Sequence, residues 1–301
     1  MRLLRFRTGA DVHHHGDDPP TRIGLAGSAG VIELGGRDPA GTGRPIATLG
    51  HAVADALAAP AALAELGHGP ADHSWDDIGL AIPADPGARM LCAGANYHKK
   101  YPLGGVVQAP PQPVYFNKPP GTLVADGEAI VRPVVSEQLD YEVELAVVIG
   151  RAGRHISLDD ALSHVGGYTV LNDGSVRNWQ RHSVAAGKNF YRSGSMGPWI
   201  CTADEIEDPA SLEVICRVNG EERQRASVGE MIFSVAEVIS YLSKVMPLEP
   251  GDIIATGSPE GTGGSHDPPK WLIPGDRVEF EIPGIGVLSN PVVDETVVPG
   301  S

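Results

Sequence analysis

Short apolar stretches separated by turn residues predict that most of this chain forms β-strands. From residue 90 onward, the alternation of hydrophobic and polar positions is typical of strands bounded by turns. The dipeptide Asn219-Gly220 lies between two of these strands and is a strong signal for a two-residue hairpin turn. The strands expected in this part of the chain are 114–118, 128–132, 141–149, 167–171, 212–218, 222–226, 252–255, 277–282 and 287–288.

Helical patterns are few and short in the same region. Ser157 opens a short helix, and Ser234 with Glu237 forms a capping box before an apolar helix that ends near Met246. We therefore expect a β-rich α+β fold with peripheral helices.

The first part of the chain differs in its pattern from the rest. One Ala- and Leu-rich helix is expected over 47–66, and residues 82–87 carry the Pro, Asp and Gly of a linker. We predict a small N-terminal α+β domain over residues 1–85 and a larger domain over residues 86–301 that carries the chemistry. The strands expected in the small domain are 3–7, 22–25 and 31–34.

The composition narrows the class of protein. The 301 residues are 42% hydrophobic, enough for a substantial core, and the 38 Gly and 26 Pro favour turns over a helical bundle. A net charge of −15 without a basic stretch makes nucleic acid and anionic membranes poor partners. No apolar stretch approaches the ~20 residues that span a bilayer, and the N-terminus turns polar too early for a signal peptide. The three Cys residues lack zinc-binding spacing, so we expect a soluble cytoplasmic protein.

The most informative chemistry lies on the apolar strand predicted over 141–149, where one residue separates Glu142 from Glu144. Side chains alternate along a strand, so both carboxylates point to one face while Tyr141 and Val143 point to the other. Two like charges on a buried face repel and lose hydration, which costs on the order of several kcal/mol unless something compensates. A divalent cation such as Mg²⁺ compensates, because it binds carboxylate oxygens.

A third carboxylate follows the next predicted strand. That strand, 167–171, ends in an Asn-Asp-Gly turn that contains Asp173. If the two strands lie side by side, Asp173 completes a triad of oxygen ligands with Glu142 and Glu144. The alternative is that the two glutamates lie on a solvated edge face and that Asp173 only begins a turn.

Several stretches together resemble the fumarylacetoacetate hydrolase family. They occur in the family's order and cover roughly residues 88 to 295. One such motif would be weak evidence, but eight in order identify the chain as a member. The eight stretches are 94–97, 116–119, 140–145, 167–177, 187–190, 197–199, 256–263 and 274–276.

The resemblance implies a fold, a cofactor and a substrate class. The family fold is a mixed β-sandwich roll with a variable N-terminal segment, and its members usually assemble as homodimers. The resemblance places Mg²⁺ or Mn²⁺ on Glu142, Glu144 and Asp173. The implied substrates are small 2-oxo acids or β-dicarbonyl compounds, and the implied reactions are hydrolytic C–C cleavage, decarboxylation and keto–enol isomerisation.

Further site residues follow from the same resemblance. Lys188 matches the family's active-site lysine and is expected to stabilise an oxyanion or donate a proton. Arg177 and Gln180 follow Asp173 by four and seven residues, so all three share one face if a helix starts there. We expect Arg177 and Gln180 to bind the substrate, with a salt bridge as the alternative for Arg177. The other candidate substrate-binding residues are Tyr97, Lys118, Thr256 and Gly257.

One stretch departs from the family pattern. Many members carry Asn-Tyr-x-x-His-x-x-Glu, whose His and Glu lie on a lid and activate the attacking water. Here the two positions hold Lys100 and Leu103. His98 is therefore the candidate base, with His182 and Lys100 as alternatives, and the Gly- and Pro-rich segment 101–113 is a candidate lid.

These features favour a divalent-metal-dependent hydrolase that cleaves a C–C bond in a 2-oxo or β-diketo acid through a metal-stabilised enolate. An isomerase, tautomerase or decarboxylase of a related 2-oxo dicarboxylate is the alternative. Such enzymes need the enolate but no activated water, which suits the missing His and Glu. A third hypothesis is a metal-binding homologue that has lost catalysis.

Overall fold

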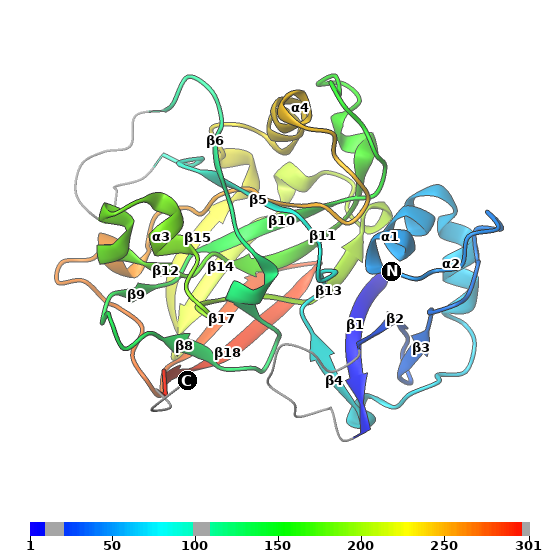
Figure 1. Ribbon diagram of the computed structural model, residues 1–301, viewed down its shortest axis with the longest axis horizontal. Coiled ribbons are helices and arrows are strands. Elements are labelled where there is room, and N and C mark those ends of the chain that lie inside the picture. The colour runs from blue at the N-terminus through cyan, green and yellow to red at the C-terminus, as the bar shows by residue number, and fades with distance from the viewer. Residues whose placement is uncertain (10–20, 99–108, 297–301) are drawn as a thin grey trace.

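Two β-sheets packed face to face, with helices at the periphery, form the centre of the molecule (Figure 1). The structure is a computed structural model that describes residues 1–9, 21–98 and 109–296. Most neighbouring strands are antiparallel, but β5 (Met90–Gly94) runs parallel to β16 (Ile253–Ala255). The expected β-rich α+β fold, a mixed sandwich roll, is therefore confirmed.

The larger sheet contains eleven strands within the described residues. Its path is β3-β2-β1-β13-β11-β10-β16-β5-β6, with β4 paired to β1 and β7 paired to β13. The bounds of its other strands are β1 (Arg2–Thr8), β2 (Arg22–Ala26), β3 (Val31–Glu33), β4 (Ile78–Ala81), β6 (Val114–Asn117), β7 (Leu123–Val124), β10 (Val143–Ile149), β11 (Val165–Asn172) and β13 (Gly194–Thr202).

The second sheet has five strands in the order β15-β14-β17-β18-β8, and a short pair joins β9 to β12. The hairpin expected around Asn219-Gly220 is confirmed between β14 and β15. Asn219 and Gly220 have φ values of 52° and 79°, the two positive values that a type I′ turn requires. The bounds are β8 (Ile130–Arg132), β9 (Leu139–Asp140), β12 (Ser175–Val176), β14 (Glu213–Val218), β15 (Glu221–Ser227), β17 (Arg277–Ile282) and β18 (Gly286–Asp294).

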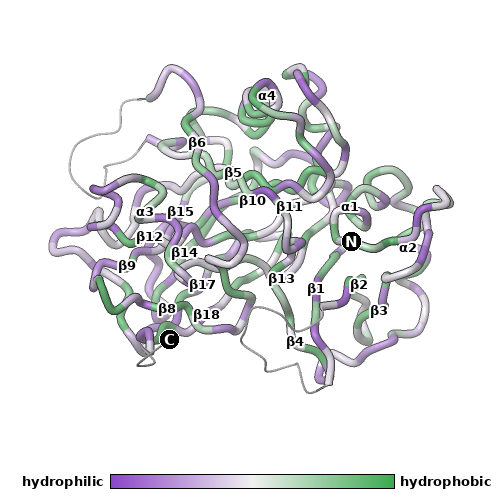
Figure 2. Tube along the Cα trace, viewed as in Figure 1, coloured by the Kyte–Doolittle hydropathy of each residue, from purple (hydrophilic) through white to green (hydrophobic). Residues whose placement is uncertain are grey.

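The main hydrophobic core fills the space between the sheets. Strand β10 contributes Val143, Leu145 and Val147 to this core, whereas Ala146 and Val148 belong to a second cluster with helix α1 (Leu49–Ala58). Figure 2 shows the central strands as mainly hydrophobic and the outer loops as mainly hydrophilic. The continuous apolar run of β10 thus reflects burial on both faces.

The N-terminal strands extend the large sheet. Strand β1 pairs antiparallel with β13, β2 and β4, so the first strand of the chain lies beside a strand from its C-terminal half. The domain boundary at residue 85 stays a prediction.

The single helix expected over 47–66 is wrong, because the segment forms two helices. Helices α1 and α2 (Pro60–Leu66) are bent by 115° at Ala59. Pro60 lacks an N–H and disfavours helical geometry at the preceding residue, which has φ −142° and ψ 60°. Among the described helices, none alone is long and apolar enough to cross a membrane, although this bent pair passes by length and composition.

The remaining helices are short. The capping box of Ser234 and Glu237 is confirmed at the start of α4 (Val235–Val245). The helix expected to open at Ser157 is instead a turn that leads into a 3₁₀ helix, with the Ser157 hydroxyl accepting from Asp160 N. The other helix bounds are α3 (Val184–Lys188), η2 (Trp75–Asp77), η3 (Pro120–Thr122), η4 (Ala161–His164), η5 (Arg177–Arg181), η6 (Ala203–Glu205), η7 (Pro209–Ser211), η8 (Val228–Glu230) and η9 (Gly263–Ser265).

Candidate metal and substrate site

Glu142 and Glu144 lie where β10 begins, on the face opposite the main core. Tyr141 and Val143 belong to that core, as the alternation along a strand requires. The two glutamates are 5% and 1% exposed. The alternative of a solvated edge face is therefore wrong.

Asp173 lies directly beside them, because β10 and β11 pair antiparallel with Val143 opposite Asn172. Asp173 N donates to Glu142 O at 2.9 Å, and Asn172 Oδ1 accepts from Glu142 N at 3.1 Å. One oxygen from each of the three carboxylates lies within 4.8 Å of the others. The predicted convergence of the triad is thus present, and its occupation by a metal stays a prediction.

The turn after Asp173 leaves no room for a side chain. A Cβ atom at Gly174 would lie 1.8 Å from Ser193 O and 2.9 Å from Gly194 Cα. Because both contacts are with backbone atoms, a larger residue would displace the turn that carries Asp173.

Lys188 ends helix α3, whose N-terminus is capped by Ser183. Its ammonium donates to Glu142 Oε2 and to Asp173 Oδ2, and it lies 5.5 Å from the centre of the Phe116 ring. Burial by itself lowers the pKa of Lys188, but Asp173 and Glu142 outweigh burial and raise that pKa above its ordinary value. Lys188 is therefore a cation directed at the carboxylates, and its expected catalytic role stays a prediction.

Arg177 braces Glu142. Its Nη2 donates to Glu142 Oε1 at 2.7 Å, its Nε to Asp140 Oδ2 at 2.7 Å and its Nη1 to Gln180 Oε1 at 3.1 Å. Burial alone lowers the pKa of Arg177, whereas Glu142 and Asp140 raise it, and the net shift is upward. The salt-bridge alternative is thus present, while Arg177 and Gln180 both line the cavity and their substrate-binding role stays a prediction.

The expected helical face shared by Asp173, Arg177 and Gln180 is wrong. The 3₁₀ helix η5 begins only at Arg177, and Asp173 lies in the turn between β11 and β12. The backbone of Ser175 and Val176 pairs with β9, which keeps the segment extended before η5. All three residues nevertheless line one cavity, and the hydrogen bond between Arg177 and Gln180 lies within η5 itself.

Lys118 lies behind Asp173 and does not line the cavity. Its side chain is 0% exposed, and its Nζ is 3.1 Å from Asp173 Oδ1. This contact is an ion pair without hydrogen-bond geometry, since Oδ1 accepts no hydrogen bond from the described residues. The Lys118 ammonium donates to the carbonyl oxygens of Gly174, at 3.4 Å, and Lys188. This position suits a support for Asp173 better than the expected contact with substrate.

Thr256 and Gly257 also stand behind the carboxylates. Thr256 Oγ1 donates to Leu145 O at 2.9 Å, and Gly257 N donates to Glu144 Oε2 at 2.9 Å. From this loop, Ser258 lines the cavity. The substrate contacts predicted for Thr256 and Gly257 stay predictions.

Tyr97, a candidate for substrate binding, and His98, the candidate base, lie in different environments. Tyr97 is 3% exposed and packs in the main core, and burial followed by nearby Glu144 raises the pKa of its hydroxyl. His98 is exposed and is not among the residues that line the cavity. Lys100, Leu103 and most of the candidate lid lie outside the described residues.

The buried charges of this network do not balance. Burial, then Asp173, then Glu142 raise the pKa of Glu144, which shows that this carboxylate lacks sufficient compensation. Within the described part of the chain, four carboxylates face three cations, which leaves one net negative charge. These buried groups are Asp140, Glu142, Glu144 and Asp173 against Lys118, Arg177 and Lys188.

This charge imbalance fits a divalent cation. The triad offers only oxygen ligands, as Mg²⁺ and Mn²⁺ prefer, and Asp173 Oδ1 is buried without a hydrogen bond. Gly257 N holds Glu144 and Arg177 holds Glu142 by hydrogen bonds, as outer-shell groups do at metal sites.

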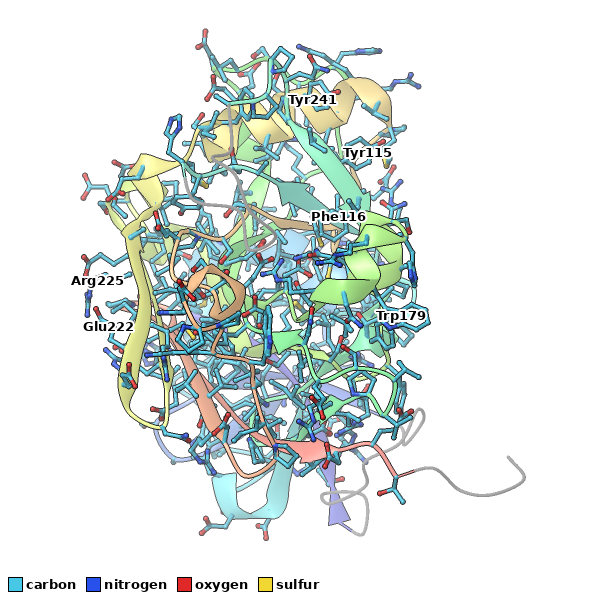
Figure 3. The ribbon with its side chains drawn as sticks, turned by 90° about the vertical axis from the view of Figure 1, so that its left-hand side faces the viewer. Tyr115, Phe116, Trp179, Glu222, Arg225 and Tyr241 are labelled. Carbon is cyan, nitrogen blue, oxygen red and sulfur yellow. The ribbon has the colours of Figure 1, made fainter. Side chains whose placement is uncertain are left out.

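The carboxylates form the floor of a cavity of about 140 Å³. One part of its wall is mainly apolar and includes Val114, Tyr115, Phe116 and Val184. Figure 3 shows Tyr115 and Phe116 on β6 next to the helical segment that bears Trp179. A cavity of ~150 Å³ holds one benzene molecule, so the described space suits a small, compact acid.

Asp140 is a buried site residue that the sequence did not single out. Its oxygens accept from Gly263 N at 2.6 Å, from Gly264 N at 3.0 Å and from Arg177 Nε at 2.7 Å. It therefore ties the Gly-rich loop to the arginine that braces Glu142. The signal that could have identified it is its place two residues before Glu142, within the motif 140–145.

The comparison with known families agrees with this site. The model of the fumarylacetoacetate (FAA) hydrolase C-terminal domain matches residues 89–293, and so the chain belongs to the fumarylacetoacetate hydrolase family. The chain is an enzyme of this family, in the range of hydrolases and isomerases that its relatives span.

Two curated relatives and one solved structure show which proteins this chain resembles. An oxaloacetate tautomerase of Bacillus subtilis (strain 168) is 43% identical over 225 residues, 73% of this chain and 75% of the relative. A mitochondrial oxaloacetate tautomerase of Xenopus laevis is 36% identical over 299 residues, 97% of this chain and 90% of the relative. Maleylpyruvate hydrolase from Sphingobium sp. SYK-6 has a TM-score of 0.77 at 30% identity and covers 98% of this chain and 100% of its own. That hydrolase has also been solved with a manganese(II) ion and pyruvate.

Proposed function

We propose that this enzyme is a divalent-metal-dependent tautomerase of a small 2-oxo dicarboxylate, with oxaloacetate as the favoured substrate. The observation that carries the proposal is the convergence of Glu142, Glu144 and Asp173 on the floor of a small cavity. Two relatives named oxaloacetate tautomerases, one matching nearly the whole chain, support this substrate.

Glu142, Glu144 and Asp173 would hold the metal, which is Mg²⁺ or Mn²⁺. When bound, the ion supplies Lewis-acid stabilisation of the negative charge on the oxygens of a 2-oxo acid. A divalent ion also changes the net charge of the buried network from one negative to one positive. That change suits an anionic substrate.

The cavity residues hold the substrate and the carboxylates in place and limit the access of water. Lys188 places an ammonium beside Glu142 and Asp173, and we infer that its positive charge stabilises the substrate oxygen that gains negative charge. Arg177 keeps Glu142 in place through its bond to Oε1. The apolar wall of Val114 and Phe116 limits the access of water to the reacting carbon.

Tautomerisation is favoured over hydrolysis because it needs no activated water. The family positions for the water-activating His and Glu hold Lys100 and Leu103. In the described part of the chain, no histidine lines the cavity, and His98 is exposed.

The proposal is tested by adding enol-oxaloacetate to the purified protein with Mg²⁺ or Mn²⁺ and following the loss of enol absorbance. Analysis of the products for pyruvate then separates tautomerisation from decarboxylation. Rapid loss of the enol with oxaloacetate conserved supports the proposal. An enol lifetime equal to that in buffer with metal contradicts it.

C–C bond hydrolysis of an acylpyruvate-like acid is the second candidate. The observation in its favour is the likeness to maleylpyruvate hydrolase, whose TM-score of 0.77 extends over 98% of this chain. Product acids from maleylpyruvate at a rate above that of oxaloacetate ketonisation would favour this candidate. A homodimer in the cytoplasm stays our expectation for either activity, and sedimentation analysis tests the dimer.

A further inference from the structure

Gln224 is a buried glutamine on β15 that lies outside the eight stretches named in the sequence analysis. Cys216 pairs with Gln224 and Arg217 with Glu222, so Arg223 is an extra residue that forms a β-bulge. The bulge places Gln224 on the inner face, where it is 1% exposed. Glu222 and Arg225 stay on the outer side of the same strand, as Figure 3 shows.

The Gln224 amide makes three hydrogen bonds with two different segments. Its Oε1 accepts from Val143 N at 3.1 Å, and its Nε2 donates to Ser258 Oγ and Pro259 O, both at 2.9 Å. The partners fix the orientation of the amide, since the opposite one would set Nε2 against an N–H and Oε1 against a carbonyl.

These two segments are the two sides of the candidate site. Val143 lies between Glu142 and Glu144 on β10, and Ser258 lines the cavity with them. The Gln224 side chain therefore connects β10, beside the carboxylates, to the loop that carries the Ser258 hydroxyl.

The loop is pressed closely onto the bulge. Gly261 has φ +103°, and a Cβ atom there would lie 2.0 Å from Arg223 O and 3.2 Å from Gln224 Cγ. The backbone contact of Gly261 and the amide of Gln224 thus hold the loop at one distance from β10.

We propose that Gln224 is a positioning residue that holds Ser258 at a set distance from Glu142 and Glu144, so that the Ser258 hydroxyl contacts the substrate oxygen. This inference rests on the proposed function, in that a 2-oxo acid occupies the cavity. Because Ser258 Oγ accepts the Nε2–H of Gln224, the hydroxyl hydrogen is turned away from Gln224.

The test uses the full-length protein loaded with Mn²⁺ and oxalate as a probe, since oxalate presents two adjacent oxygens like a 2-oxo acid. The variant Gln224→Glu keeps the acceptor for Val143 N and replaces the donor to Ser258 and Pro259 by an acceptor. The second variant is Gln224→Met, which removes both the acceptor and the donor of the amide and nearly keeps the side-chain volume. Ser258→Ala removes the hydroxyl, and Glu222→Gln on the outer face of β15 is the matched control.

Calorimetry gives the oxalate Kd, and electron paramagnetic resonance gives the Mn²⁺ Kd. Gln224→Glu and Ser258→Ala should each weaken oxalate by about tenfold or more, as expected for losing a buried hydrogen bond. The Mn²⁺ Kd of Gln224→Met should change by less than about threefold, because this variant adds no charge to the buried network and keeps all three carboxylates. Glu222→Gln should leave both constants unchanged.

The decisive result is the double variant of Gln224 and Ser258. If Gln224 acts through Ser258, the double variant binds oxalate no more than about twofold worse than the weaker single variant, because contacting residues are not additive. Multiplied losses in the cycle with Gln224→Met, which adds no charge that repels oxalate, would overturn the inference. A wild-type protein that binds Mn²⁺ but not oxalate would overturn the proposed function and the inference together.

Discussion

Replacing Lys118 by Met removes a fully buried ammonium while nearly keeping the length of the side chain. Lys118 and Asp173 are 0% and 2% exposed in this ion pair, with 3.1 Å between Nζ and Oδ1. The change leaves Asp173 Oδ1 without its cation and the carbonyl oxygens of Gly174 and Lys188 without a donor.

The expected loss is large because the pair is buried. Breaking a buried ion pair by removing one partner costs about 3–5 kcal/mol. At about 2–4 °C per kcal/mol, the thermal midpoint should fall by roughly 6–20 °C. The matched control is Lys270→Met, which breaks a pair with Glu221 whose side chains are 44% and 59% exposed. That loss should be small, because solvent and salt screen an exposed ion pair.

Urea unfolding of both variants with chelator present measures the two free energies, and initial rates with oxaloacetate give KM. A loss in Lys118→Met that equals the small loss in Lys270→Met would refute the structural argument. If KM rose at the same time, Lys118 would instead bind substrate, as the sequence predicted.

Three further substitutions test two supports of the metal site and one buried carboxyl outside it. Asp140→Asn removes the negative charge paired with Arg177 and turns one of the two acceptor oxygens into an NH₂ donor, so Mn²⁺ affinity should fall about 10–100-fold. Gly174→Ala should lower the thermal midpoint and weaken Mn²⁺, because its Cβ would lie 1.8 Å from a carbonyl oxygen, whereas Gly87→Ala has nothing within 4 Å. Asp126→Asn should raise the free energy of unfolding at pH 7, because burial raises the pKa of Asp126 above its ordinary value. A carboxyl with a raised folded pKa contributes stability that is present below about pH 3.9 and lost as the pH rises, so the advantage of Asn should vanish in acid.

Calorimetric Mn²⁺ titration checks the first two of these predictions, and parallel urea curves from pH 3 to 7 check the third. Unchanged Mn²⁺ affinity in Asp140→Asn would contradict the proposed coupling through Arg177. Equal midpoints for the two glycine variants would contradict the steric argument, and a pH-independent advantage in Asp126→Asn would contradict the linkage.

Much of the carboxylate site could be predicted because it depends on local rules. Strand alternation alone put Glu142 and Glu144 on one face, and antiparallel pairing of the next strand brought Asp173 beside them. The hairpin at Asn219-Gly220 follows in the same way from its turn residues.

Other features depend on contacts between distant segments. Strand β13 was not expected, because its Gly197 and Pro198 resemble a loop, and it is held by β11 and β1. Likewise, the composition of 47–66 favoured one helix, but Pro60 divides it.

The residues that support the carboxylates from the surrounding elements were the hardest to predict from the sequence. Lys118 and Arg177 have the residue types of substrate ligands, yet both contact carboxylates of the chain itself. Gln224 reaches the site only because a bulge turns it inward. Such positions are set by packing between elements, which a one-dimensional pattern does not contain.

The central claim is that the triad holds a divalent ion that drives tautomerisation of a 2-oxo acid. Its most direct test is stopped-flow ketonisation of enol-oxaloacetate by the wild type and by Glu144→Gln, with Mn²⁺ binding measured on the same samples. We expect the wild type to bind Mn²⁺ and shorten the enol lifetime, chelator to abolish the effect, and Glu144→Gln to lose both binding and rate. An unchanged enol lifetime in Mn²⁺-loaded wild type, or full activity in Glu144→Gln, would contradict the claim.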